Sequence, residues 1–198
     1  MKKVVFNKTK NYREANMKTA EAAWNSTRGM HFEKRVQNRL ESNFYDCTIM
    51  HDVRVPSRKD NTTQIDFILL HETGIYVIEA KNYSGTVSGT KDDLLWKKTW
   101  VDDSGIPHIK MISNPIKQNE GHIKYIRKLV GDDIPMFSIS ILSEKCDARS
   151  IRVYGRNTYM FHLKESMRMI REIMDFSRVC LNEERIEELN LELSTSKL

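Results

Sequence analysis

The sequence predicts a one-domain α/β fold in which a central sheet is flanked by helices. Two runs, residues 65–70 and 75–80, are apolar at nearly every position, as is typical of strands buried on both faces of a sheet. Apolar side chains recur at helical spacing over about 29–40 and 115–130. With 198 residues and 39% hydrophobic content, the chain can bury one core of good size.

Each further element is predicted from apolar periodicity and from turn or capping residues at its ends. The helix over 115–130 has the clearest signals, because Asn114 can cap it, Pro115 suits its first position and Gly131 suits its end. Alternating residues between the second run and this helix predict a β excursion from the core. In chain order, the first expected elements are a basic tail over 1–11, helices over 12–24 and 29–40, and strands over 47–55, 65–70 and 75–80. Short strands of the excursion follow around 86–88, 94–101 and 108–112, and then the helix over 115–130. The last expected elements are a strand over 136–142, further strands around 151–153 and 159–161, and helices around 163–174 and 183–192.

Composition and element order predict an N-terminal extension over residues 1–28, a core over 29–162 and a C-terminal helical extension over 163–198. The formal charge of +5 and the pI near 9.0 permit binding to a polyanion without requiring it. Three widely spaced cysteines predict reduced, packing side chains, and no apolar run is long enough for a membrane span. We therefore expect a cytoplasmic protein without membrane association, of undefined oligomeric state.

Asp66 and the triplet Glu79-x-Lys81 are the strongest candidates for chemistry. They lie within or beside the two apolar runs, and a glycine between the runs predicts a tight hairpin turn. If residues 72–73 are the central loop residues, Asp66 lies opposite Glu79; if residues 73–74 are, it lies opposite Lys81. In both registers the three side chains share one face of the sheet, with opposite Cβ atoms about 5 Å apart. A turn longer by one residue would instead put Asp66 on the other face.

Charged side chains at the ends of buried strands are costly unless they are paired or bound to metal. A structural interpretation pairs Lys81 with one acid in a buried salt bridge and leaves the other acid to cap a turn. The chemical interpretation is that two carboxylates and a lysine form the site of a metal-dependent phosphodiesterase.

Several ordered motifs then resemble a known family. They comprise Gln64-Ile65-Asp66, the stretch over residues 74–85 that ends in Asn82-Tyr83-Ser84-Gly85, then Trp96, and finally Asn114-Pro115-Ile116-Lys117-Gln118. Over about residues 29–130, they resemble the nuclease-related domain, NERD, a branch of the PD-(D/E)XK nuclease superfamily. The chain departs from the family in that Phe67 follows the aspartate where histidine is common, and alanine replaces valine between Glu79 and Lys81. Neither departure removes a catalytic group.

The resemblance implies an αβββαβ nuclease core, with a mixed central sheet flanked by helices, plus the β-hairpin excursion and the C-terminal helices. It implies that Glu33, Asp66 and Glu79 are acidic metal positions, that Lys81 is the active-site lysine and that Gln118 is the glutamine of the following helix. Oxygen ligands of this kind suit Mg²⁺ or Mn²⁺. We therefore expect a Mg²⁺-dependent nuclease that hydrolyses phosphodiester bonds of nucleic acid, with DNA favoured, by metal-activated water. The alternative is a catalytically silent module that binds nucleic acid or protein as an adaptor.

Four side chains outside this set are candidates for contact with nucleic acid. Arg58 and Lys59 are adjacent bases in the loop beside the proposed site, where a solvated role is the alternative. Trp96 and Lys98 alternate on the β excursion, and aromatics interleaved with lysine can stack bases and touch phosphates. Tryptophans on a small hairpin also pack it against a core, and we favour that role for Trp96.

Gln118, His122 and Tyr125 recur at helical spacing on a polar stripe that could face a cleft. No second histidine is spaced to form a metal pair with His122. We therefore expect His122 to be an ordinary, partly exposed helix residue.

Overall fold

A computed structural model describes residues 27–57 and 61–195 of the chain. Its core is a five-stranded mixed sheet in the order β1-β2-β3-β7-β9. The strands β1, β2 and β3 are antiparallel neighbours, and β7 and β9 run parallel to β3. These strands span β1 Thr48–Pro56, β2 Thr62–His71, β3 Gly74–Lys81, β7 Met136–Leu142 and β9 Thr158–His162. The predicted tail over 1–11, the predicted helix over 12–24, and Arg58 and Lys59 lie outside the described residues.

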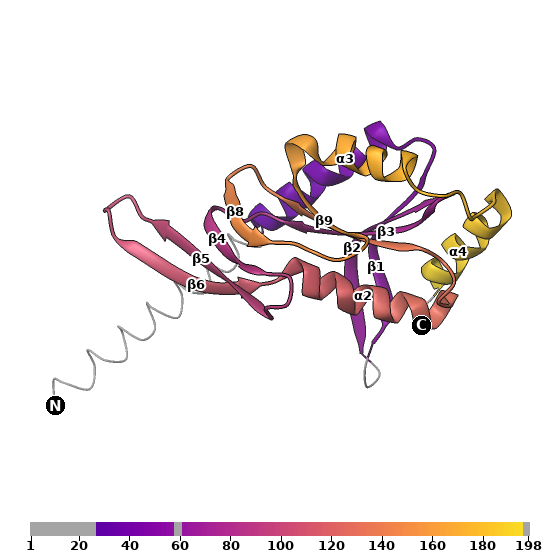
Figure 1. Cartoon of the computed structure of the whole chain (residues 1–198), viewed down its shortest axis with the longest axis horizontal. Coiled ribbons are helices and arrows are strands. Elements are labelled where there is room, and N and C mark those ends of the chain that lie inside the picture. Colours follow the sequence, from indigo (N-terminus) through magenta and orange to yellow (C-terminus); the bar gives the residue numbers. More distant parts are fainter. Residues whose placement is uncertain (1–26, 58–60, 196–198) are drawn as a thin grey trace, which may run out of the picture.

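Helices cover both faces of this sheet, which makes the architecture a three-layer α/β/α sandwich (Figure 1). A helix over residues 27–43 and α3 (Leu163–Asp175) pack on one face. The opposite face is covered by α2 (Pro115–Val130) and α4 (Glu183–Thr195). Alternate side chains of β2 and β3 enter the two cores, which is why both strands are apolar at consecutive positions. The predicted α/β class with a mixed, helix-flanked sheet is confirmed.

The C-terminal helices complete these cores. Met167, Ile170 and Met174 of α3 are buried with the helix over 27–43. Leu189 and Leu193 of α4 are buried with the apolar side of α2. Their burial explains the apolar spacing along two helices that are otherwise rich in charge.

The predicted β excursion is a second sheet of four strands, in the order β6-β5-β4-β8. Its strands are β4 (Gly85–Thr90), β5 (Leu95–Val101), β6 (Pro107–Ser113) and β8 (Cys146–Arg152), with β8 parallel to β4. Figure 1 shows the β5–β6 hairpin projecting away from the central sheet. The strand expected around residues 151–153 therefore begins earlier, at Cys146. Its first half was missed because only Cys146 and Ala148 are buried there, between polar side chains.

Two buried asparagines hold the helix α2 in place, and one of them binds the central sheet. Asn114 caps its first turn by accepting from the N–H groups of Ile116 and Lys117. Asn119 is fully buried, and its amide donates to the carbonyls of Val77 in β3 and Ile139 in β7. These bonds fix the rotation of α2, and with it the neighbouring Gln118, relative to β3.

Truncating Asn119 is therefore expected to destabilise the fold. Asn119→Ala leaves two buried carbonyls without this donor and opens a small cavity, so the free energy of unfolding should fall by about 2–4 kcal/mol. Lys124→Ala, an exposed change on the same helix, should stay within about 0.5 kcal/mol of the parent. Urea denaturation measures the free energy of unfolding of both variants. Equal stabilities would show that the Asn119 hydrogen bonds do not stabilise the fold.

Candidate active site

The β2–β3 hairpin has the predicted register in which Asp66 lies opposite Glu79. His71 pairs with Gly74, so residues 72–73 form the loop, and the ladder runs to Phe67 opposite Ile78. Asp66 is the next residue along β2 and therefore lies opposite Glu79. Gly74 has φ of +138°, and a Cβ there would lie 2.3 Å from a backbone oxygen. Only glycine fits this turn, and the turn fixes the register.

Asp66 is held where the hairpin ladder stops. The backbone N–H of Ala80 donates to Asp66 Oδ2 at 2.8 Å. The Asp66 side chain thus takes the place of the next backbone hydrogen bond between β2 and β3. Burial raises the pKa of Asp66, against the opposing effects of the Ala80 hydrogen bond and of the positive charge of Lys81. The bond to Ala80 orients the carboxyl group and leaves Oδ1 available to a ligand.

Glu79 is the most deeply buried acid of the site, at 2% exposure. Its Oε1 lies 2.5 Å from Lys81 Nζ, whereas its buried Oε2 has no hydrogen-bond partner. Burial, followed by the negative charge of Asp66, raises the pKa of Glu79 to about 7, against the opposing effects of the charge and the hydrogen bond of Lys81. The salt-bridge interpretation accounts for Oε1 and for the bond of Asp66 to Ala80, but it leaves a buried carboxylate oxygen unexplained.

Glu33, on the helix over 27–43, lines two cavities beside the hairpin. The first, of about 230 Å³, is also lined by Asp52 and Asp66. The second, of about 340 Å³, is also lined by Lys81 and by basic side chains of the second sheet. Burial and the charge of Asp66 raise the pKa of Glu33. Glu33 is thus within electrostatic range of Asp66 and Lys81.

His122 was expected to be partly exposed, and that expectation is wrong. It is 5% exposed, and its Nδ1 lies 3.7 Å from Glu79 Oε2. Burial and the nearby positive charge of Lys81 lower the pKa of His122 to about 4, so its imidazole is neutral at physiological pH. Its spacing of four residues from Gln118 was the available signal, because such residues share a helix face.

Gln118 lies one turn before His122 on α2, and its Oε1 is buried without a hydrogen-bond partner. No hydrogen bond joins Gln118 to Asp66 or Glu79 in the described part of the chain. Gln118 Oε1, Asn119 Oδ1 and His122 Nδ1 are three buried polar atoms on the helix that lack a hydrogen-bond partner within the described residues. Of the three side chains, His122 forms the contact with Glu79.

Trp96 has the packing role that the sequence favours. Its side chain is 0% exposed, packs in the core of the second sheet and donates from Nε1 to the Thr90 carbonyl at 2.8 Å. A core position satisfies both the large apolar ring and its single N–H. Lys98, two residues further along β5, instead lines the 340 Å³ cavity with Lys81.

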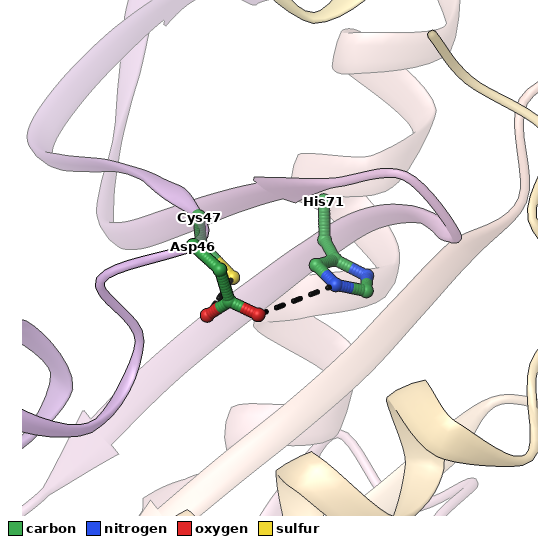
Figure 2. Close-up of side chains that lie close together, drawn as sticks. All are labelled: Asp46, Cys47 and His71. Carbon is green, nitrogen blue, oxygen red and sulfur yellow. Dashed lines mark hydrogen bonds and ion pairs between the residues drawn. The ribbon is translucent and has the colours of Figure 1, made fainter. Parts of the chain in front are cut away.

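A separate group of Asp46, Cys47 and His71 lies at the other end of β2 (Figure 2). Five residues of strand, about 17 Å, separate His71 from Asp66. Asp46 Oδ2 is 3.8 Å from His71 Nε2, but both Asp46 oxygens are already held by the Arg171 guanidinium, at 2.6 and 2.8 Å. Burial raises the pKa of the Cys47 thiol to about 12, which disfavours the thiolate that metals bind. We assign this group to joining β1, β2 and α3.

The acids of the hairpin, in contrast, fit a hard divalent cation. Burial raises the pKa of Glu33, Asp66 and Glu79, and their mutual repulsion adds to this for Glu33 and Glu79. A bound cation relieves both effects. Carboxylate oxygens suit Mg²⁺ or Mn²⁺, and Oε2 of Glu79 offers a ligand atom that has no hydrogen-bond partner within the described residues.

Comparisons with known proteins identify the family of the chain. The family model of the nuclease-related domain, NERD, matches residues 28–143, more than half of the chain. The chain belongs to the nuclease-related domain family.

Two individual proteins are similar to the chain. An uncharacterized protein of Bacillus anthracis is 29% identical over 153 residues, which cover 77% of this chain and 68% of that protein. Among solved structures, the small subunit of the heterodimeric restriction endonuclease R.BspD6I is 13% identical, with a TM-score of 0.31, over 85% of this chain and 81% of that subunit. No helix in the described residues is long and apolar enough to cross a membrane.

Proposed function

We propose that the chain is a Mg²⁺- or Mn²⁺-dependent nuclease that hydrolyses phosphodiester bonds, with DNA as its substrate. The observation that carries the proposal is the Glu79 carboxylate, which pairs with Lys81 through one oxygen and keeps the other buried and unpartnered beside Asp66. A buried charge left in this state costs stability, and a ligand that binds it recovers that cost. Membership of the nuclease-related family supports the same chemistry.

The residues of the chain would divide the work as follows. Asp66 and Glu79, with Glu33 alongside, would hold the cation. When bound, such an ion lowers the pKa of water and neutralises charge on the phosphate. Lys81 Nζ would donate to the attacking water or to a phosphate oxygen, where it stabilises negative charge as it develops.

Residues of α2 would act on the same face. Neutral His122 would donate to Glu79 Oε2 once that carboxylate is ionised, and so orient it. The amide of Gln118 would hold a water or a phosphate oxygen.

The proposal predicts cleavage of labelled DNA by the parent protein with Mg²⁺ or Mn²⁺, and none in EDTA. Asp66→Asn should slow cleavage about 10²-fold, because asparagine can still accept from Ala80 but lacks the charge. Asp133→Asn, the same change at an exposed position, should cleave as the parent does. The substrate panel contains duplex, branched and single-stranded DNA and RNA of one sequence. No cleavage of any of them, or equal rates for Asp66→Asn and the parent, would refute the proposal.

The alternative is an adaptor that keeps the fold without turnover, which the Lys81–Glu79 ion pair would also suit because it is complete without metal. Calorimetric titration with Mn²⁺ separates the two functions. A nuclease site binds Mn²⁺ in the parent and loses that binding in Asp66→Asn. An adaptor shows no binding in either protein.

A further inference from the structure

The inner face of the β5–β6 hairpin carries two lysines directly opposite each other. Lys98 and Lys110 are cross-strand partners, and both line the 340 Å³ cavity that also contains Glu33 and Lys81. Because side chains alternate along a strand, Lys97, the residue before Lys98, points to the opposite, outer face. The hairpin therefore presents a paired positive charge to the candidate active site.

This pair lacks a counterion within the described residues. Like charges directly opposite in a sheet destabilise it, and Arg28 adds a third positive charge to the same cavity. Burial, then the charges of Lys110 and Arg28, lower the pKa of Lys98. No carboxylate in residues 27–57 and 61–195 forms an ion pair with any of the three. An anion from outside the chain would relieve this repulsion.

Lys98 is nevertheless held in place. Its Nζ lies 3.3 Å from Ser84 Oγ and 4.9 Å from the centre of the Trp100 ring. Trp100 is stacked on His108, its cross-strand partner, and His108 Nε2 lies 2.7 Å from Asp102 Oδ2. The ammonium is thus positioned by a hydroxyl and a ring, which leave it free to donate to a further ligand.

We propose that Arg28, Lys98 and Lys110 bind a phosphate of the substrate strand, next to the phosphate cleaved at Asp66 and Glu79. The proposal rests on the nuclease function for the identity of the anion. A nucleic-acid backbone supplies phosphates at regular spacing, so a strand whose scissile phosphate lies near Lys81 places a neighbouring phosphate in the same cavity. The second sheet then acts as a backbone clamp: it binds the phosphate backbone of the nucleic acid and positions the strand without distinguishing base sequences.

Binding is measured by fluorescence anisotropy of labelled single-stranded and duplex DNA, in EDTA and over a range of NaCl concentrations. Lys98→Gln and the double variant Lys98→Gln/Lys110→Gln remove the inner charges. Lys97→Gln is the matched control, since it removes the same charge from the adjacent, exposed position on the outer face. Lys98→Arg keeps the charge. Circular dichroism verifies that each variant is folded.

We expect Lys98→Gln to weaken binding about fivefold or more and the double variant further, with the salt dependence of log K falling by about one per lysine removed. Lys98→Arg should bind nearly as the parent does, and Lys97→Gln should change affinity less than about twofold. Parent-like binding by the double variant, equal losses for Lys97→Gln and Lys98→Gln, or no binding by the parent would each overturn the proposal.

Cleavage with Mn²⁺ is measured separately on the same proteins. Binding through Lys98 without cleavage contradicts the nuclease function alone. Cleavage by the parent, with unchanged binding by the double variant, contradicts the backbone clamp alone.

Discussion

Replacing Glu79 by glutamine is expected to slow cleavage about 10³-fold while stabilising the metal-free protein above neutral pH. Glutamine keeps the size of the side chain but removes the charge that would hold the cation. The same charge is costly without a ligand, because Glu79 is buried beside Asp66. One substitution therefore has opposite effects on stability and activity, whereas a purely structural salt bridge would lose stability when broken.

The pH dependence of this effect follows from the raised pKa of Glu79. Below pH 4.5 the carboxyl group is protonated in both the folded and the unfolded chain, so it contributes no difference. Between pH 4.5 and about 7 the unfolded chain releases this proton and the folded one retains it, so stability falls as pH rises. Above pH 7 the full penalty is present. The stabilising effect of Glu79→Gln should therefore be near zero at pH 4 and reach roughly 1–3 kcal/mol at pH 8.

Urea denaturation in EDTA at pH 4 and pH 8 measures this difference for the parent and for Glu79→Gln. Glu187→Gln, at an exposed position of α4, is the charge-matched control and should change stability equally at both pH values. Destabilisation by Glu79→Gln at pH 8 would show that the Lys81 ion pair outweighs burial. Cleavage at the parent rate would remove Glu79 from the active site.

Replacing Lys81 by glutamine is expected to reduce cleavage about 10³-fold while leaving Mn²⁺ binding intact or stronger. Lys81 Nζ forms an ion pair with Glu79 Oε1 and so places a positive charge where the cation would bind. The substitution removes a hydrogen-bond donor to the reacting groups. It also removes a positive charge that competes with the metal for Glu79.

Calorimetric titration and single-turnover cleavage on the same Lys81→Gln sample separate the two effects. Lys164→Gln, at an exposed position of α3, should match the parent in both measurements. A joint loss of Mn²⁺ binding and cleavage would mean that Lys81 holds the carboxylates in place and takes no part in the reaction.

The hairpin at the centre of the site was accessible from sequence because its geometry is local. Two apolar runs and one glycine predicted a tight turn with two possible registers, and both brought Asp66 to the face shared by Glu79 and Lys81, whereas a turn one residue longer would not have done so. The choice between them depended on Gly74, whose close contact with the backbone of Pro135 forms only when β7 is in place. No pattern within the hairpin contains that information.

Residues contributed by other elements were harder to foresee. His122 looked like an ordinary polar helix residue, because its burial depends on how Asn119 rotates α2 against β3 and β7. Lys110 drew no attention, since its meeting with Lys98 requires the pairing of β5 with β6. Trp96 was a candidate both for core packing, which was favoured, and for contact with nucleic acid, and the second sheet buries it. Tertiary packing determines the surroundings of each of these side chains, and the periodicity of a single segment does not predict that packing.

The central claim is that Asp66 and Glu79 together hold a divalent cation beside Lys81. Anomalous scattering from Mn²⁺-soaked crystals at pH 8 tests it most directly. The account predicts one dominant anomalous peak between the carboxylates of Asp66 and Glu79, at oxygen–metal distances of about 2.0–2.3 Å, and its loss in Glu79→Gln. A dominant peak at Asp46 and His71, or no peak at the hairpin acids, would contradict it.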